Sequence, residues 1–286
     1  MSEKISGETK LVALLGDPVK HSKSPEMHNL GFQYLGIDYI YMAFEVKERH
    51  LKDAVEGLRS LNAVGFNLTM PHKQAVIPLL DEISEEAKLC GAVNTVKNDN
   101  GKLIGYNTDG MGFVRSLYDE GIQVEGNKFT VIGAGGAAKS IVIRLAMEGA
   151  EEIALFNRSK QPANSLVQLI NAYIPRCKIN WFEINMDIFK EQCKDSAVLI
   201  NTTNVGMGNS INESIITDPD VFHHPLVVAD IIYSPAKTKM LKMAEKEGCH
   251  IINGSGMIIG QGALAFKIWT GCEMPVDLVR NSFTGQ

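Results

Sequence analysis

The sequence predicts an α/β protein of two domains, each built around a mainly parallel sheet. Three observations carry this prediction. Short apolar runs alternate with segments of helical periodicity from residue 11 onward, which is typical of βαβ units. A second series of the same kind begins near residue 129. The chain has 286 residues, which is long enough for two separate cores.

The first series contains clear helix signals and a hairpin signal. Its expected strands and helices alternate over residues 11–15, 24–34, 39–46, 51–61, 65–68 and 84–89. The motif Ser24-Pro25-Glu26 predicts a helix start with serine as the N-cap, and Gly36 is placed to end that helix. The Asn-Asp-Asn-Gly stretch over 98–101 predicts a tight turn between strands over 92–97 and 102–106.

The second series begins after a predicted helix over 112–120. A strand over 129–132, a helix over 136–147 and a strand over 153–156 form a new βαβ unit, and a further strand is expected over 197–200. No low-complexity linker separates the two series. We therefore expect the domain junction near the helix over 112–120.

Charge and composition argue against several classes of protein. The 28 basic and 33 acidic residues leave a net charge of -5, and no stripe of Lys and Arg could neutralise a nucleic-acid backbone. Five scattered cysteines without Cys-x-x-Cys spacing predict reduced thiols, no metal site and a cytoplasmic location. No apolar run approaches the roughly 20 residues of a membrane helix. We therefore expect neither nucleic acid, nor a membrane, nor a metal as a partner.

A glycine-rich turn predicts a dinucleotide site. It comprises Gly133, Ala134, Gly135, Gly136, Ala137 and Ala138. The turn follows a predicted strand and opens a predicted helix, so the G-x-G-x-x-A pattern stands in the context that dinucleotide binding requires. Glycine lets backbone N–H groups approach a pyrophosphate, and the helix N-terminus adds partial positive charge. This pattern predicts a Rossmann-type dinucleotide-binding domain.

The end of the next strand favours NADP over NAD. An NAD site commonly places Asp or Glu about 20 residues past the glycines to hold the ribose 2′-hydroxyl. Here the stretch is Asn157-Arg158-Ser159, and no carboxylate is present. Arg158 offers a guanidinium group for a 2′-phosphate, with Lys160 nearby. Arginine can also stack on adenine, so the use of NAD stays open.

Four polar clusters are expected where strands of the first domain end. They are His21–Pro25, Asn67–Lys73, Gly91–Thr95 and Gly105–Gly110. Taken singly, Ser24 and Asp109 are equally explained as helix caps, and Asn94 as a turn residue. Together the clusters present hydroxyl, amide, amine and carboxylate groups at the edge where open α/β sheets bind ligands. Such a set suits a small polyhydroxylated ligand.

In this order the motifs resemble the shikimate dehydrogenase family, and most closely its quinate/shikimate dehydrogenase branch. The resemblance covers nearly the whole chain. The motifs are His21–Asn29, Asn67–Lys73, Gly91–Thr95, Asn107–Gly110, the glycine turn with Asn157-Arg158-Ser159, Asp230–Pro235, Gly254–Met257 and Gln261. The branch assignment depends further on residues 41–46.

The resemblance implies roles for individual residues. Ser22 and Ser24 match the two residues whose hydroxyls hold the substrate carboxylate in the family, and Tyr233 matches a residue near the carboxylate. The ring-hydroxyl ligands correspond to Asn67, Thr69, Asn94 and Gln261. The cofactor residues correspond to Gly133, Ala134, Gly135, Gly136, Ala137, Asn157, Arg158, Ser159, Thr202, Asn204, Gly254 and Met257. His72 is interpreted as a wall residue of the site rather than as an acid.

Lys73 and Asp109 correspond to the family's catalytic pair. In ketone reduction, hydride moves from the nicotinamide to the carbonyl carbon of 3-dehydroshikimate, and a donor must meet the developing alkoxide. A lysine ammonium can do this, and Asp109 would orient it. Whether Lys73 is a proton shuttle or an electrostatic clamp stays open at this stage.

The resemblance also implies the organisation and setting of the protein. Residues 1–110 with 261–286 would form the substrate-binding and catalytic domain, and residues 111–260 the NAD(P)-binding Rossmann domain. The expected reaction is the reversible NAD(P)-dependent oxidation of shikimate, and of quinate in the dual-substrate case. It would serve aromatic amino-acid biosynthesis through the shikimate pathway, or quinate use. A monomer or homodimer is expected.

Two alternatives remain open. A methylenetetrahydrofolate dehydrogenase-like enzyme would want an aromatic-lined slot for folate, which the Ser, Thr and Asn clusters do not suggest. A non-catalytic sensor of NAD(P) and shikimate-type ligands would not need both Lys73 and Asp109. Turnover by the wild type and its loss in Lys73→Ala would separate an enzyme from a sensor.

Overall fold

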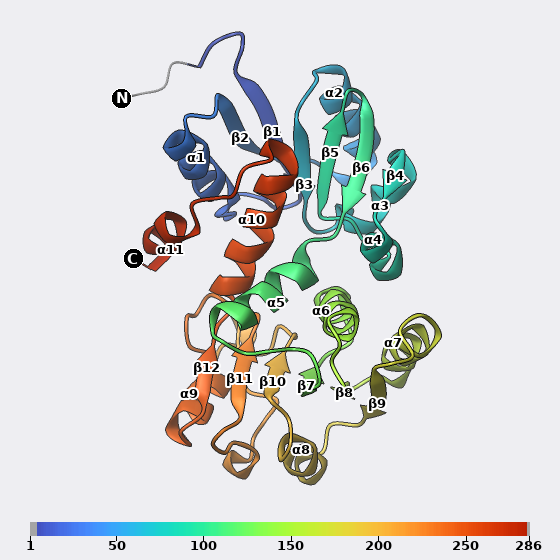
Figure 1. The fold of residues 1–286 in the computed structure, drawn as a ribbon, viewed down its shortest axis with the longest axis vertical. Coiled ribbons are helices and arrows are strands. Elements are labelled where there is room, and N and C mark those ends of the chain that lie inside the picture. The colour runs from blue at the N-terminus through green and yellow to red at the C-terminus, as the bar shows by residue number, and fades with distance from the viewer. Residues whose placement is uncertain (1–4, 285–286) are drawn as a thin grey trace. The chain divides into compact units, whose positions relative to one another are not determined.

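The computed structural model describes residues 5–284, and its chain divides into two compact units (Figure 1). One unit contains the residues up to Gly112 and those from Ile259 onward, and the other contains Phe113–Ile258. The boundaries fall within α5 (Asp109–Asp119) and α10 (Ser255–Thr270). The ends of the predicted substrate domain, residues 1–4 and 285–286, lie outside the described residues.

The first unit is built on a six-stranded mixed sheet with the order β2-β1-β3-β5-β6-β4. Its strands are β1 (Lys10–Gly16), β2 (Tyr39–Glu45), β3 (Gly65–Leu68), β4 (Glu82–Ile83), β5 (Thr95–Asp99) and β6 (Lys102–Tyr106). The pairs β1–β2, β1–β3 and β4–β6 are parallel, and β3–β5 and β5–β6 are antiparallel. The predicted α/β class with a mainly parallel sheet is confirmed.

The helices of this unit lie on both faces of the sheet. They are α1 (Ser24–Leu35), α2 (Leu51–Ser60), α3 (His72–Ala75), α4 (Glu85–Cys90), α11 (Val276–Thr284) and most of α10, with short 3₁₀ turns η1 (Glu48–His50) and η2 (Ile77–Leu79). Strand β1 contributes to the cores on both faces of the sheet, because successive side chains of a strand point to opposite faces. Ala13 and Leu15 join the core under α2, while Val12 and Leu14 join the core with α1 and α10.

The predicted hairpin is confirmed, and its turn has the expected chemistry. Asn100 and Gly101 have positive φ angles of 54° and 93°. A two-residue turn with positive φ at both positions matches the twist of the flanking strands. The Asn98 Oδ1 atom accepts the Gly101 N–H at 2.8 Å and holds the turn closed.

Two local expectations were wrong. Ser24 is not the N-cap of α1: it is the first helical residue, and Lys23 is the cap. The Ser22 hydroxyl accepts the Ser24 N–H at 3.2 Å instead. The cluster Gly91–Thr95 does not follow a strand but leads into β5. It still reaches the same edge of the sheet, because β5 runs antiparallel to β3.

The second unit is an all-parallel six-stranded sheet with the order β12-β11-β10-β7-β8-β9. Its strands are β7 (Lys128–Ile132), β8 (Glu152–Phe156), β9 (Lys178–Phe182), β10 (Val198–Asn201), β11 (Val227–Asp230) and β12 (His250–Ile252). Its helical elements include α6 (Gly136–Met147), α7 (Lys160–Tyr173), α8 (Met186–Cys193), α9 (Lys239–Lys246), η3 (Gly208–Ser210) and η4 (Pro219–Val221). This strand order is that of the Rossmann fold, as predicted.

The direction of winding reverses between β7 and β10, which are neighbours in the sheet. Ligands of open α/β sheets bind outside the carboxyl ends of the strands at such a point. The glycine turn follows β7, and Thr202 follows β10. The topology of this unit therefore brings two of the predicted cofactor segments together. Separately, none of the helices within residues 5–284 is long and apolar enough to cross a membrane.

Candidate active site

A lysine and an aspartate form the centre of the candidate site. Lys73 lies in the short helix α3, just after β3, and Asp109 is the first residue of α5. Lys73 Nζ lies 2.6 Å from Asp109 Oδ2, with side chains that are 33% and 15% exposed. The pair is thus sheltered but open to solvent on one side. A charge-assisted hydrogen bond of this length fixes the direction of the ammonium group.

Asn94 holds Asp109 in place. The Asn94 side chain is 3% exposed, and its Nδ2 donates to Asp109 Oδ1 at 2.8 Å and to Thr108 Oγ1 at 3.0 Å. Its Oδ1 accepts the backbone N–H of Thr108 at 2.9 Å. Both amide hydrogens of Asn94 are therefore engaged within the protein. In this structure Asn94 orients the aspartate, and Thr108 contributes to the network, although the motif Asn107–Gly110 gave it no individual role.

Asn67 extends the same network toward β2. It is buried at the end of β3, and its Nδ2 donates to the Asn94 carbonyl oxygen at 2.9 Å. Its Oδ1 accepts the Tyr41 hydroxyl at 2.7 Å. A continuous chain of hydrogen bonds thus connects four of the predicted residues. These residues are Asn67, Asn94, Asp109 and Lys73.

The other predicted substrate residues lie in different environments. Ser22 and Thr69 are half-buried and follow β1 and β3, as do Ser24 and Lys73. Gln261 is half-buried on α10, and its backbone lies against Gly112 of α5. Tyr233 belongs to the second unit, where it follows β11 with 42% of its surface exposed.

His72 is fully buried beside this network. Its Nε2 lies 2.7 Å from the Val46 carbonyl oxygen, so the ring ties α3 to the segment after β2. This contact occupies one ring nitrogen with a backbone group. The geometry agrees with the interpretation of His72 as a wall residue.

The glycine turn of the second unit is shaped for close approach of a ligand. Gly133 has a φ of 112°, and a Cβ atom there would lie 2.5 Å from Thr202 Oγ1. Thr202 is held by donating to the Ile132 carbonyl oxygen at 2.6 Å. Gly135 and Gly136 are exposed, and open space surrounds the position of a Cβ at each. The turn therefore presents free backbone at the N-terminus of α6.

A cavity of about 430 Å³ lies beside this turn. It is lined by Ile132, Gly133, Phe156, Asn157, Arg158, Ile184, Thr203, Val205 and Ile215. Apolar side chains with one guanidinium group suit a flat base that carries a phosphate nearby. Sequence reasoning missed Ile184 and Ile215. They lie in loops after β9 and before η4, and an isoleucine in a loop carries no recognisable signal of a binding site.

The buried carboxylate of Asp230 holds the loop that follows β10 in place. Asp230 accepts hydrogen bonds from Asn201 Nδ2 at 3.1 Å, Thr238 Oγ1 at 2.8 Å and the Ile232 N–H at 3.0 Å. Burial raises the pKa of Asp230 above its usual value. Asn201 Oδ1 in turn accepts the Thr203 N–H at 3.0 Å. This network shapes the loop that carries the predicted cofactor residues Thr202 and Asn204.

The remaining predicted cofactor residues lie near the start of α10 and after β8. A Cβ at Gly254 would lie 1.9 Å from the Ile231 carbonyl oxygen, so only glycine fits there. Met257 is half-buried on the first turns of α10. Asn157 Nδ2 donates to the Ser159 carbonyl oxygen at 2.7 Å and shapes the turn that presents Arg158.

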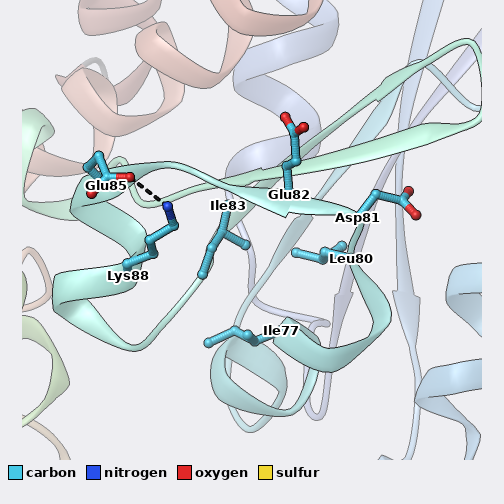
Figure 2. Close-up of a pocket in the computed structure, with 7 residues that line it drawn as sticks. All are labelled: Ile77, Leu80, Asp81, Glu82, Ile83, Glu85 and Lys88. Carbon is cyan, nitrogen blue, oxygen red and sulfur yellow. Dashed lines mark hydrogen bonds and ion pairs between the residues drawn. The ribbon is translucent and has the colours of Figure 1, made fainter.

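A second hollow, of about 610 Å³, lies in the first unit and contains none of the predicted residues (Figure 2). It is lined by Ile77, Leu80, Asp81, Glu82, Ile83, Glu85 and Lys88. The carboxylates on its rim pair with neighbouring cations, as Glu85 does with Lys88 at 2.6 Å. Within residues 5–284, moreover, no group of three or more His, Cys, Asp or Glu side chains could hold a metal ion.

Three family models match separate parts of the chain. The model described as "Shikimate dehydrogenase substrate binding domain" matches residues 14–96. The model described as "Shikimate / quinate 5-dehydrogenase" matches residues 116–213. The model described as "Shikimate 5'-dehydrogenase C-terminal domain" matches residues 254–282.

Individual relatives match over almost the full length. A shikimate dehydrogenase (NADP(+)) from Alkaliphilus metalliredigens is 55% identical over 280 residues, which cover 98% of both chains. The structure of a shikimate 5-dehydrogenase from Listeria monocytogenes in complex with shikimate and NAD is 43% identical, with a TM-score of 0.95 and 99% of both chains covered. The structure of the Thermus thermophilus enzyme in complex with NADP(H) and shikimate is 32% identical, with a TM-score of 0.84, and covers 96% of this chain and 98% of that one.

Proposed function

Since the chain belongs to the shikimate dehydrogenase family, we propose that it catalyses the reversible oxidation of shikimate to 3-dehydroshikimate with NADP as the hydride acceptor. The reaction would serve aromatic amino-acid biosynthesis. One observation carries the proposal for this chain. The contact between Lys73 Nζ and Asp109 Oδ2, at 2.6 Å, ends a chain of hydrogen bonds through residues with the chemistry to bind a hydroxylated acid.

Lys73 is the group that meets the reacting oxygen. An ammonium group has three N–H donors, of which Asp109 uses one, so two are left for a substrate oxygen. A donor at this position stabilises negative charge that develops on the oxygen in the transition state. Asp109 keeps the ammonium oriented, and Asn94 keeps Asp109 oriented. In the oxidation direction the carbon gives up its hydride and the hydroxyl proton passes to this pair: the Lys73 ammonium has no lone pair, so it takes this proton only as it gives one of its own to Asp109 Oδ2.

The substrate contacts follow from the chemistry of the predicted residues. A carboxylate only accepts hydrogen bonds, so the hydroxyl donors of Ser22 and Ser24 suit it. Asn67, Thr69 and Gln261 would bind ring hydroxyls, and Tyr233 would lie near the carboxylate. Asn94 contributes through Asp109, because its own amide hydrogens are already engaged.

The cofactor residues fit NADP. The turn over 133–136 with its open backbone would hold the pyrophosphate, and the cavity of about 430 Å³ would hold the adenosine part. Arg158 would bind the 2′-phosphate, and Thr202, Asn204, Gly254 and Met257 would line the nicotinamide side. NADP, when bound, supplies the nicotinamide that accepts the hydride.

The finer assignments of domain, location and assembly are also part of this proposal. Residues 1–110 with 261–286 would bind substrate, and residues 111–260 would bind NADP. A cytoplasmic location and a monomeric or homodimeric state stay predictions. Oxidation of quinate as a second substrate also stays a prediction.

The test is a spectrophotometric assay of the purified protein with shikimate and with quinate, each with NADP and with NAD. We expect reduced nicotinamide with shikimate and NADP. Faster turnover with NAD, or with quinate, would contradict the assigned cofactor or substrate. The absence of turnover in all four mixtures, with shikimate binding retained, would favour the sensor.

A further inference from the structure

The hydroxyl of Thr95 lies buried between two side chains of the candidate site. Thr95 is the first residue of β5, and it is 0% exposed. Its Oγ1 donates to Asn94 Oδ1 at 3.0 Å and accepts from Asn67 Nδ2 at 3.0 Å. Thr95 belongs to the motif Gly91–Thr95, in which only Asn94 was given a role. A single hydroxyl therefore joins Asn67, an expected substrate ligand, to the residue that holds Asp109.

The groups around Asn94 leave only one orientation for its amide. The backbone N–H of Thr108 can only donate, and it lies 2.9 Å from Asn94 Oδ1. The Asp109 carboxylate accepts, and it lies 2.8 Å from Asn94 Nδ2. The end of the amide that contacts Thr95 is therefore the oxygen, which can only accept. The Thr108 hydroxyl lies farther from the Thr95 oxygen, at 3.4 Å, so the single hydroxyl proton of Thr95 is directed to Asn94.

The amide of Asn67 is oriented by the same reasoning. One Nδ2 hydrogen is donated to the backbone carbonyl oxygen of Asn94 at 2.9 Å, a group that can only accept. The other is donated to Thr95 Oγ1, whose lone pairs are available because its own proton is used for Asn94. The Oδ1 atom accepts the Tyr41 hydroxyl at 2.7 Å and keeps one lone pair for a ligand. Asn67 can therefore accept a hydrogen bond from a ring hydroxyl of the substrate.

The hydrogen bonds between Asn67 and Asp109 all point in the same direction. Asn67 donates to Thr95, and Thr95 donates to the Asn94 side chain. Asn94 then donates to Asp109 Oδ1, and the other oxygen of this carboxylate holds Lys73 at 2.6 Å. Hydrogen bonds in series polarise one another, and this effect is stronger where water is excluded. Thr95 provides the middle hydroxyl of a series that ends on the carboxylate of the catalytic pair.

We propose that Thr95 is a positioning residue, whose hydroxyl couples the substrate ligand Asn67 to the pair of Lys73 and Asp109. Thr95 acts through Asn94, which transmits the orientation to the aspartate. The role depends on the oxygen of Thr95 and not on its methyl group. The inference rests on the proposed function, because it assumes that shikimate binds at Asn67 and reacts at Lys73.

The test is Thr95→Val, which keeps the branched shape of the side chain and replaces its hydroxyl with a methyl group. One Nδ2 hydrogen of Asn67 then has no acceptor, and Asn94 Oδ1 loses one of its donors. We expect kcat/KM for shikimate to fall about 10- to 100-fold, the effect of a buried polar group left without a partner. The kcat should fall through Asn94, and the KM for shikimate should rise through Asn67. The KM for NADP should stay within about twofold, because none of these side chains lines the cavity beside the glycine turn.

Thr95→Ser separates the hydroxyl from the packing of the side chain. Serine keeps the hydroxyl and loses the methyl group, so its kcat/KM for shikimate should stay within about threefold of the wild type. If Thr95 served only to fill space, the order would be reversed, because valine keeps the volume and serine does not. A loss in Thr95→Ser as large as that in Thr95→Val would overturn the proposal, and so would an unchanged kcat/KM in Thr95→Val.

The matched control is Thr130→Val in the second unit. Thr130 is also 0% exposed on a strand, β7, and its hydroxyl lies 2.8 Å from Ser196 Oγ. The substitution removes a comparable buried hydroxyl, and its effect on stability is measured by the melting temperature. Its kcat/KM for shikimate should equal that of the wild type. Equal losses of kcat/KM in Thr130→Val and Thr95→Val would show that activity only follows stability, and would overturn the proposal.

A double-mutant cycle with Asn94→Ala tests the path of the effect. Thr95→Val should lower kcat by a smaller factor in the Asn94→Ala background, because the residue that transmits the effect is already absent. An equal factor in both backgrounds would contradict the action of Thr95 through Asn94.

The wild type separates the two levels of inference. If wild-type protein does not oxidise shikimate, the proposed function fails and the role of Thr95 fails with it. If the wild type oxidises shikimate and Thr95→Val does so with the same kcat and KM, only the role of Thr95 fails.

Discussion

Lys73 and Asp109 are 36 positions apart, and they act as one group because Asn94 holds the aspartate toward the lysine. A lysine on an exposed surface would move freely, and its ion pair would contribute little. Here the carboxylate has one oxygen for Asn94 and the other for Lys73, so both partners are fixed. The fixed ammonium group of Lys73 therefore places its positive charge at one point of a sheltered site, where it has the largest effect on a developing alkoxide.

Asp109→Asn tests this arrangement at its centre. The amide can still accept from Asn94 but no longer holds the ammonium by charge. We expect kcat for shikimate oxidation to fall by about 10²- to 10⁴-fold, the usual range for loss of acid–base assistance, with NADP affinity unchanged. Steady-state kinetics and NADP titration measure the two quantities.

The matched control for Asp109→Asn is Lys88→Met, which breaks another lysine–carboxylate pair of the same length, 2.6 Å to Glu85. That pair is exposed, and its loss should leave kcat unchanged. A kcat in Asp109→Asn within threefold of the wild type would contradict the role of Asp109.

Arg158 is the second residue whose role can be measured by itself. It is exposed at the cavity beside the glycine turn, where the corresponding position in an NAD site carries a carboxylate. We expect Arg158→Leu to lower kcat/KM for NADP about 10- to 100-fold, the effect of losing a charge-assisted bond to phosphate. The kcat/KM for NAD should change less than threefold.

The control for Arg158→Leu is Lys178→Met, which removes an exposed lysine of the same unit that pairs with Glu151 at 3.6 Å. Its ratio of NADP to NAD activity should equal that of the wild type. Equal losses with both cofactors in Arg158→Leu would show that the arginine stacks on adenine and does not recognise the 2′-phosphate.

At the scale of helices and strands, the sequence predicted those features that depend on a few neighbouring residues. The apolar runs and the glycines at 36 and 101 gave the strands, the end of α1 and the hairpin, because each depends on backbone preferences of a few residues. The cap of α1 was wrong because the helix already begins at Ser24, whose N–H is held by the Ser22 hydroxyl. The cavity residues Ile184 and Ile215 could not be predicted, because only the folded sheet brings their loops together.

Helices α5 and α10 make an unusually close contact within the first unit. A Cβ at Gly112 would lie 2.4 Å from the backbone nitrogen of Gln261, and a Cβ at Gly260 would lie 2.6 Å from the Gly112 carbonyl oxygen. No side-chain movement relieves a clash with backbone, so the helices themselves would have to separate. This contact also determines where Gln261 lies.

Gly112→Ala should therefore destabilise the protein by about 1–3 kcal/mol, the range for overpacking, and raise the KM for shikimate through the shift of Gln261. Urea denaturation and steady-state kinetics measure the two effects. Gly57→Ala is the matched control, since Gly57 lies inside α2 with open space where its Cβ would be. It should stabilise the protein by about 0.5–1 kcal/mol through helix propensity. Equal stability of the two variants would contradict the close contact.

For the whole molecule, stability in acid depends on a histidine that the reaction does not use. His28 is fully buried among aromatic rings, and neither ring nitrogen has a hydrogen-bond partner within residues 5–284. Burial lowers the pKa of His28 from 6.5 to about 3. The unfolded chain therefore binds a proton at this residue more readily than the folded chain. Stability is lost as the pH falls from 6.5 toward 3.

The size of this loss can be measured with one tryptophan as the reporter. The chain has two tryptophans: Trp181 lies in the second unit, and Trp269 lies 5.2 Å from the His28 ring in the first. In a Trp181→Phe background, fluorescence follows the unit that contains His28.

Between pH 7 and pH 5 the His28 contribution should lower the free energy of unfolding of that unit by about 2 kcal/mol. His28→Phe keeps an aromatic ring beside Tyr41 but cannot bind a proton, so it should lack this part of the pH dependence while all other titrating groups stay the same. Parallel pH profiles for the two proteins would show that the proton reaches His28 in the folded state, and that the aromatic cluster around it opens to water.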